Sequence, residues 1–290
     1  MTLVIPGKTF LAGEYAVLVG GKALGVATKP CFEVNFGRNH FTPLHEKSAA
    51  GLFLKSLGLP RGEINSFENN FNVAGFGKST AEFIATWFHH HEIQAEEAPT
   101  FMKKIFNQYR ELFDQTSELK IIKPSGADLM IQLLGQITYF DPEIMPSKSL
   151  NWVFPEIDFD IISTGIKIAT HDHLAALNLK DLEPLTKPVD EILMTYFSVQ
   201  PEAFLDSLKD WSLKLMDLKL QHHQSFALKQ QIEKCPEVML AKPNGALGAD
   251  TLTVFYKPEH KNQVRNYFKD NLVKQVTGLE NLAKGAHYVD

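Results

Sequence analysis

The sequence predicts an α+β protein made of two domains. Three observations support this prediction: the N-terminal stretch is rich in strand-like segments, helical patterns follow it, and a strand, loop, strand unit lies near residue 245. Strands and helices that gather in separate runs are typical of α+β folds. The length of 290 residues and the hydrophobic content of 44% suit two cores of ordinary size. We expect the domains to be residues 1–175 and 176–290.

The N-terminal region is expected to form short strands. Apolar residues fill Leu3–Ile5 and Ala16–Val19, and Phe32–Phe36 alternates with a period of two, which is typical of half-buried strands. Turn-forming residues at Pro6–Lys8 separate the first two of these segments. We therefore predict three strands joined by turns.

Helical periodicity begins at Ser79. Apolar residues at Ala81, Ile84 and Phe88 would share one helix face, and Ser79 followed by Glu82 fits a capping box at the helix start. Further elements follow from the same kind of pattern. They are a helix over Phe101–Phe113, a buried helix over Leu129–Leu134, a strand over Ile137–Phe140, and a strand with a turn within Phe159–Gly165.

The second half of the chain is expected to form an antiparallel α+β layer. Apolar residues recur every three or four positions within Pro201–Lys234, which predicts helices there. Strands over Met239–Ala241 and Thr251–Tyr256 would flank the loop Lys242–Ala249. A last helix is expected from about Glu259 to Leu272.

Composition and charge exclude several classes of protein. Lys and Arg number 29 against 34 Asp and Glu, so the formal charge of -5 lacks the basic excess of a nucleic-acid binder. The two cysteines, Cys31 and Cys235, have no spacing suited to a disulfide framework or a zinc ribbon. Lys8 and Glu14 interrupt the apolar N-terminus far short of a membrane span. We therefore expect a cytoplasmic protein that binds neither nucleic acid nor a membrane.

Two groups of histidines are candidate metal ligands. His89, His90 and His91 would point about 100° apart on a helix, so they cannot chelate one ion together and are expected at the surface. His171 and His173 could share one face of a strand and bind a metal. Hydrogen bonding within a loop is the favoured role for these two residues.

Four short segments combine glycine, which lets a ligand approach the backbone, with a charged or hydroxyl residue. They are Pro6–Leu18, Gly75–Glu82, Lys123–Met130 and Lys242–Asp250. In the first segment Lys8 and Glu14 lie among apolar residues, and burial of an unpaired charge costs several kcal/mol. These two side chains must therefore reach a cleft or pair with opposite charges, and either a functional site or a structural ion pair fits.

The second segment predicts a phosphate site. A glycine-rich turn that enters a helix offers free backbone N–H groups and the positive end of the helix dipole to an anion. The segment is not a P-loop, because that motif requires glycine at the position of Asn72 and a buried strand before it. A purely structural alternative also fits, in which Ser79 caps the helix and Lys78 is solvated.

The third and fourth segments allow two interpretations each. Asp128 begins an apolar helix, where a carboxylate can complement the helix dipole or accept a proton from an alcohol held nearby. The loop Lys242–Asp250 could bind a ligand or only connect two strands.

In order and spacing, these segments resemble the motifs of GHMP kinases. That family has an N-terminal Pro-Gly-Lys…Gly-Glu-His/Tyr segment, a central Gly-Leu-Gly-Ser-Ser-Ala phosphate loop and a C-terminal glycine-rich loop. Leu11–Leu18 and Lys242–Ala246 look more like phosphomevalonate kinases than mevalonate kinases. The resemblance spans most of the chain and implies a GHMP two-domain fold, with an N-terminal βαβ-containing domain and a C-terminal ferredoxin-like α+β domain.

The resemblance also implies a role for each matched residue. The catalytic residues would be Lys8 and Asp128. The ATP phosphates would contact Gly75, Gly77, Lys78, Ser79 and Thr80, and the Ser79 hydroxyl is a candidate Mg2+ ligand. The substrate would contact Glu14, Tyr15, Ser125, Gly126, Lys242, Gly245 and Ala246. The glutamate that binds the metal in this family cannot be placed on the sequence.

The implied activity is transfer of the ATP γ-phosphate to phosphomevalonate or a similar small anionic acceptor, by a monomer or homodimer. Mevalonate, or the acceptor of another GHMP kinase, is the first alternative, and a decarboxylase that first phosphorylates its substrate is a second. A ligand-sensing protein without turnover is a third. It is suggested by Lys78, which replaces a serine, and by Leu247 and Ala249, which replace glycines.

Overall fold

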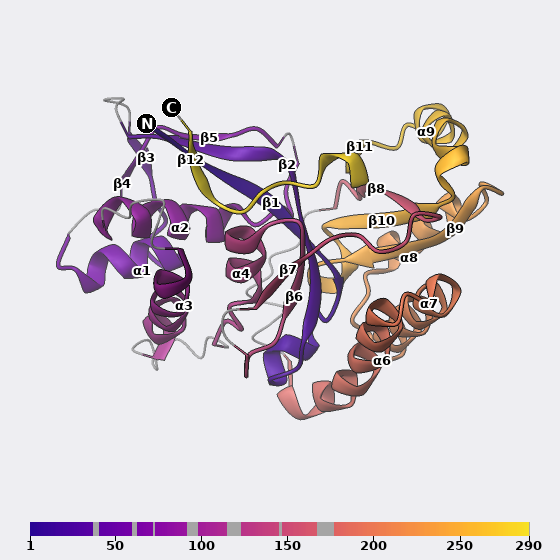
Figure 1. Ribbon diagram of the computed structural model, residues 1–290, viewed down its shortest axis with the longest axis horizontal. Coiled ribbons are helices and arrows are strands. Elements are labelled where there is room, and N and C mark those ends of the chain that lie inside the picture. The colour runs from indigo at the N-terminus through magenta and orange to yellow at the C-terminus, as the bar shows by residue number, and fades with distance from the viewer. Residues whose placement is uncertain are drawn as a thin grey trace.

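The computed structural model describes residues 1–36, 41–59, 63–71, 73–91, 98–114, 123–144, 147–166 and 177–289. Within these ranges the chain forms two main antiparallel sheets and a small two-stranded sheet, with helices packed on them (Figure 1). The prediction for His171 and His173 lies outside the described residues, as does Asn72.

The first sheet contains both ends of the described chain. Its strand order is β12-β1-β2-β6-β7, with β5 also paired to β2, and every pair is antiparallel. Its two long strands are β1 (Thr2–Ala12) and β2 (Ala23–Asn35). The shorter strands are β5 (Phe67–Asn69), β6 (Ile137–Phe140), β7 (Lys148–Leu150) and β12 (His287–Val289). Figure 1 shows the yellow C-terminal segment returning beside the indigo N-terminal strand.

Helices pack on this sheet and on one another. The helices that contact β1 and β2 directly are α2 (Lys78–His91) and α4 (Ala127–Leu134). Two more, α1 (Ala49–Ser56) and α3 (Ala98–Asp114), pack against these helices, and α1 also contacts α3. Beside them the small sheet pairs β3 (Phe41–Pro43) with β4 (Glu63–Asn65).

The second sheet has the antiparallel order β11-β8-β10-β9. Its strands are β8 (Asp158–Ser163), β9 (Val238–Asn244), β10 (Thr251–Tyr256) and β11 (Gln275–Gly278). Between β8 and β9 the chain forms α6 (Thr186–Phe197), α7 (Pro201–Asp217) and α8 (His223–Ile232), and α9 (Lys261–Asp270) joins β10 to β11. This is the split βαβ arrangement of a ferredoxin-like domain, which confirms the predicted fold of the second half.

The strands do not separate into two sheets at residue 175. β8 precedes this position and pairs in the second sheet, whereas β12 follows it and pairs in the first. One large hydrophobic cluster joins residues of both sheets, from Leu3 to Phe255, and a smaller one fills the space under α9. The domain limits 1–175 and 176–290 therefore stay a prediction.

One predicted strand is wrong. Ala16–Val19 forms a 3-10 helix, and the Leu18 N–H donates to the carbonyl of its N-cap, Tyr15, at 3.0 Å. Gly13 and Gly20, both with positive φ, allow the chain to turn at each end of this segment. Its apolar residues face the core from a turn, and a four-residue apolar run does not distinguish this from a short strand.

The helices agree more closely with the predictions. α3, α4 and α7 lie where periodicity indicates, although α1 and α6 were not predicted. α2 begins at Lys78, so Ser79 lies within its first turn and the predicted capping box of Ser79 and Glu82 is wrong. The Glu82 carboxylate instead contacts Lys78 Nζ at 3.5 Å across one turn. His89 and His90 are exposed, as expected, and the His91 ring stacks on Trp87. None of the helices within the described ranges has the length and apolar run that crossing a bilayer requires.

Candidate active site

A cavity of about 550 Å3 gathers residues from all four glycine-containing segments. Every site residue named from the sequence lines this cavity except Lys242. They are Lys8, Glu14, Tyr15, Gly75, Gly77, Lys78, Ser79, Thr80, Ser125, Gly126, Asp128, Gly245 and Ala246. The fold thus brings together, at one place, segments that are more than a hundred residues apart in the sequence.

Lys8 on β1 and Asp128 in the first turn of α4 form an ion pair inside this cavity. Lys8 Nζ lies 3.0 Å from Asp128 Oδ2, and the two side chains are 9% and 36% exposed. The Gln132 side chain of α4 donates to the Pro6 carbonyl at 2.8 Å, which fixes α4 against β1. Gly126 has a φ of +84°, and a Cβ there would lie 2.4 Å from the Phe106 ring. The pair is therefore held rigidly, with the carboxylate accessible from the cavity.

The glycine-rich turn before α2 reaches the same point. The Lys8 N–H donates to the Phe76 carbonyl at 3.1 Å, so the turn is hydrogen-bonded to β1. Gly77 has a φ of +83°, and a Cβ at this position would lie 2.9 Å from Lys8 Cγ. Only glycine allows the turn to approach Lys8 this closely. This close approach directs the N-terminus of α2, with Ser79 and Thr80, into the cavity. This geometry suits an anion such as phosphate.

Glu14 and Lys242 form a second, buried ion pair. Lys242 Nζ lies 2.8 Å from Glu14 Oε1 and also donates to Asn244 Oδ1 at 2.9 Å. The Trp211 indole N–H donates to the other Glu14 oxygen at 3.3 Å. Burial lowers the pKa of Lys242, and the Glu14 charge opposes this shift. The Lys242 side chain is fully buried and does not line the cavity. In this structure its role is therefore that of the structural partner of Glu14.

Tyr15 fixes the loop that follows β9. Its hydroxyl accepts a hydrogen bond from the Leu247 N–H at 2.7 Å, and burial raises the pKa of Tyr15 above its ordinary value. Leu247 has a φ of +54° and Gly245 a φ of +83°, so the loop is tightly turned. Gly245 and Ala246 are thereby held at the cavity wall.

Sequence reasoning missed two polar residues of the cavity. Asp250 ends the fourth segment, and burial raises the pKa of its carboxyl group, while Lys8 lowers it and Asp128 raises it further. Tyr109 on α3 lines the cavity as well, and burial raises the pKa of its hydroxyl. A single Asp before a strand and a single Tyr on an apolar helix face carry no distinctive pattern. The position of Asp250 within a glycine-containing segment was the one available signal.

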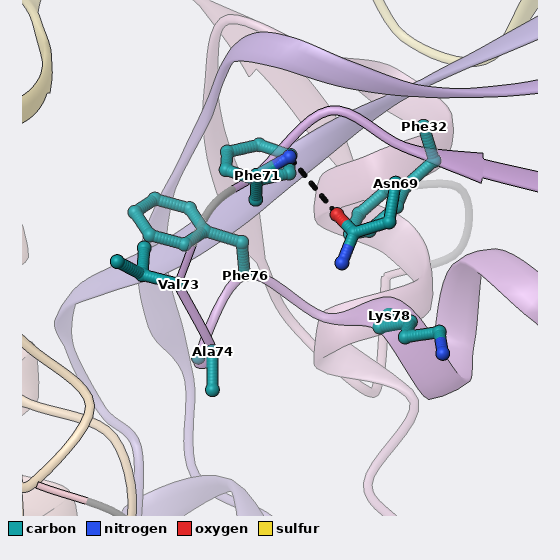
Figure 2. A pocket seen from close by; sticks show the side chains of 8 residues that line it. Phe32, Asn69, Phe71, Val73, Ala74, Phe76 and Lys78 are labelled. Carbon is teal, nitrogen blue, oxygen red and sulfur yellow. Dashed lines mark hydrogen bonds between the residues drawn. The ribbon is translucent and has the colours of Figure 1, made fainter.

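A second cavity of about 390 Å3 lies beside the first, and we call it the aromatic cavity because three phenylalanines line it (Figure 2). The Phe71 and Phe76 rings stack with their centroids 4.4 Å apart, and Phe32 also lines the wall. The Asn69 side-chain oxygen accepts a hydrogen bond from the Phe71 N–H at 3.0 Å, and Figure 2 shows its nitrogen directed away from that backbone. The two cavities share Ala74, Gly75 and Lys78, so they meet at the glycine-rich turn.

Comparisons with known proteins identify the fold. The chain aligns with the crystal structure of Methanococcus jannaschii mevalonate kinase at a TM-score of 0.67 and 14% identity, with 98% of each chain covered. Streptococcus pneumoniae phosphomevalonate kinase in complex with phosphomevalonate and AMPPNP aligns at 0.66 and 16% identity, over 96% of this chain and 99% of that one. Lactococcus lactis galactokinase complexed with galactose aligns at 0.66 and 10% identity, over 99% and 95%.

No protein-family model and no curated protein sequence matches the chain. The three kinases above share one architecture across nearly their whole length with this chain. The chain therefore has the fold of the GHMP kinases, which confirms the predicted fold.

Proposed function

We propose that this protein is an ATP-dependent small-molecule kinase of the GHMP type. The observation that carries the proposal is the Lys8–Asp128 pair, which faces a glycine-rich helix N-terminus across one cavity. Phosphoryl transfer depends mainly on positioning and on neutralising charge, so a cation, a carboxylate and backbone N–H groups around one space suit this reaction.

In this proposal, the base and the phosphates of ATP would each occupy one of the two adjoining cavities. The aromatic cavity has stacked rings and a side-chain amide, which suit a purine base. From there the phosphates would cross the turn at Gly75 and Lys78 and reach the N-terminus of α2. Lys78 is half exposed and borders both cavities, so its ammonium group can contact the polyphosphate chain.

Asp128 and Lys8 would act on the acceptor. With an alcohol acceptor, Asp128 orients the hydroxyl group and accepts its proton, while Lys8 stabilises the negative charge that develops on the oxygen. With a phosphate acceptor the attacking oxygen is already anionic, so Lys8 matters more as a positive charge and Asp128 less as a base.

The residues present also fit a magnesium ion. Mg2+ prefers hard oxygen ligands and usually takes one or two from protein side chains together with phosphate oxygens. The Ser79 hydroxyl in the first turn of α2 lines the cavity beside the proposed path of the phosphates. When bound with ATP, the ion would neutralise charge on the transferred group.

Phosphomevalonate is our first choice of acceptor, and mevalonate is the second. The first choice is supported by the resemblance of Leu11–Leu18 and Lys242–Ala246 to phosphomevalonate kinases. It is also supported by the alignment with a phosphomevalonate kinase that holds phosphomevalonate and AMPPNP. Lys8 gives the acceptor side of the cavity a cation that suits an anionic substrate.

The proposal is tested by ADP release from Mg-ATP against mevalonate, phosphomevalonate, diphosphomevalonate and a panel of small sugars. We expect one acceptor to stimulate ADP release well above the rate with ATP alone. Phosphorus NMR of the product would then identify the phosphorylated oxygen. Nucleotide binding without turnover on any acceptor would favour the ligand-sensing alternative, and the absence of nucleotide binding would contradict both functions.

A further inference from the structure

Asp250 is a third carboxylate group in the cavity, and its backbone is fixed from both sides. Its N–H donates to the Asn244 carbonyl at 3.2 Å, and its own carbonyl accepts from the Thr164 N–H at 3.4 Å. The residue directly precedes β10, in the loop that also contributes Gly245 and Ala246 to the cavity. The direction of the side chain is therefore set by the second sheet.

The Asp250 side chain packs between the two glycine loops. A Cβ at Gly75 would lie 2.5 Å from Asp250 Cβ, and a Cβ at Gly245 would lie 2.1 Å from Asp250 Oδ2. Both glycines have positive φ. The carboxylate is thus pressed against the turn proposed to hold the nucleotide phosphates, although it belongs to the other half of the molecule.

The three carboxylates of the cavity differ in their partners. Asp128 is paired with Lys8 at 3.0 Å and Glu14 with Lys242 at 2.8 Å. Within the described ranges, neither carboxylate oxygen of Asp250 has a hydrogen-bond or salt-bridge partner. Asp250 is therefore the carboxylate whose charge the protein leaves uncompensated by direct contact.

An uncompensated carboxylate beside a phosphate site presents an electrostatic conflict. Two negative groups repel each other strongly where water is excluded. A divalent cation between them converts this repulsion into attraction, and Mg2+ is usually held by one or two carboxylates together with substrate phosphates. In the described ranges no three carboxylate, His or Cys groups gather to hold a metal alone, so phosphate oxygens would have to complete the site.

We propose that Asp250 is the metal-directed carboxylate of this site, acting together with the Ser79 hydroxyl on the Mg2+ ion that accompanies the nucleotide. This inference rests on the proposed function. Asp128, already paired with Lys8, stays available to the acceptor. Asp250 precedes β10 of the second sheet, whereas Ser79 lies in α2, which packs on the first sheet. The metal–nucleotide complex would therefore also join the loop after β9 to the N-terminus of α2.

The test compares the affinity for AMPPNP in Mg2+ and in EDTA, measured by calorimetry, for the wild type and Asp250→Asn. We expect Mg2+ to increase the affinity of the wild type for AMPPNP. In Asp250→Asn this increase should be smaller by a factor of at least about ten. The metal-free affinity should be unchanged or higher, because a repulsive charge is gone. Loss of the free Mn2+ signal in electron paramagnetic resonance, with AMPPNP present, should be weaker for the variant.

Asp190→Asn is the matched control, because Asp190 forms an exposed pair with Lys22 away from the cavity. It should keep the full Mg2+ gain. If Asp250→Asn fails to fold, Asp250→Ser takes its place. A variant that keeps the whole Mg2+ gain, or loses affinity equally with and without metal, would overturn the inference and leave the kinase proposal intact. A wild type that binds no nucleotide at all would overturn both.

Discussion

At the scale of single residues, the negative charge of Asp250 in the cavity is unfavourable for the folded state. Asp250 carries a pKa raised first by burial and then by Asp128, against the opposing effect of Lys8. A raised carboxyl pKa means that the folded protein binds this proton more tightly than the unfolded chain does. Stability is therefore lost as the pH rises from the ordinary value of 3.8 through the raised value.

This sign gives the first prediction. In EDTA at neutral pH, Asp250→Asn should raise the melting temperature by about 2 °C or more, because it removes a charge that the fold disfavours. The difference should shrink as the pH is lowered toward 4, where the wild-type carboxyl group becomes neutral. Thermal unfolding followed by circular dichroism at several pH values measures this. A neutral-pH melting temperature below that of the wild type would show that the charge is compensated in the folded state.

Some charged residues of the site could be recognised from the sequence, and their partners could not. Lys8 and Glu14 were conspicuous because charges stood within apolar runs, and each forms an ion pair in the structure. Their partners could not be derived, since pairing joins residues that are 120 and 228 positions apart. The family resemblance implied that Lys242 contacts the substrate, whereas its side chain is buried and paired with Glu14.

At the scale of elements, the glycine-rich turn before α2 depends on two conformations that other residues adopt at a cost. Gly75 has a φ of +96°, and a Cβ placed there would lie 2.5 Å from Asp250 Cβ. Gly77 has a φ of +83°, and a Cβ placed there would lie 2.9 Å from Lys8 Cγ. Gly20 also has a φ of +83°, but nothing lies within 4 Å of a Cβ placed there. A substitution at Gly20 therefore measures the cost of the left-handed backbone conformation without the steric clash that an added Cβ causes at Gly75.

Gly75→Ala should weaken nucleotide binding by about tenfold or more, because a methyl group would displace Asp250 and the turn. Gly20→Ala should leave nucleotide affinity unchanged, and both variants should lose about 1–2 kcal/mol of stability from left-handed strain. Calorimetric titration and urea unfolding measure the two effects. Equal affinities for the two variants would mean that the turn does not touch the nucleotide.

Helices and strands were predictable where their pattern was long. α3 and α7 have apolar residues at helical spacing, and β10 is a run of β-forming residues, so their positions follow from the sequence. Ala16–Val19 was mistaken for a strand because four apolar residues fit several conformations. The turn predicted at Pro6–Lys8 is wrong, because β1 continues through these residues with only a register shift between Pro6 and Gly7.

At the scale of the whole molecule, the buried pair of Glu14 and Lys242 joins the first sheet to the second. Glu14 follows β1 and Lys242 lies on β9, and Trp211 of α7 contacts the same carboxylate. Removing one member of a buried pair leaves an uncompensated charge, which is more harmful than removing both.

Lys242→Met should therefore destabilise the protein by about 3–5 kcal/mol, and the double variant Glu14→Gln/Lys242→Met should recover part of the loss. Urea unfolding measures both. Lys187 and Glu191 form an exposed pair at 4.0 Å, so Lys187→Met should change stability little and serves as the control. A double variant as unstable as the sum of its single variants would show that the two groups do not interact.

The overall fold was predictable from motif order and spacing, but the sharing of strands between the two halves was not. Local pattern identifies an element and says nothing about its partner, so the pairing of β12 with β1 and of β8 with β10 required the structure. The same limit applies to the two cavities. Phe32, Phe71 and Phe76 have the pattern of ordinary core residues, and only their arrangement forms a wall.

The central claim is that the cavity around Lys8 and Asp128 transfers a phosphoryl group from ATP. The measurement that tests it most directly is acceptor-dependent ADP release by the wild type, Lys8→Met and Asp128→Asn, with nucleotide affinity measured alongside. We predict turnover by the wild type and a loss of about 100-fold or more in each variant, while nucleotide affinity changes little. Acceptor-dependent turnover that survives both substitutions would contradict the claim.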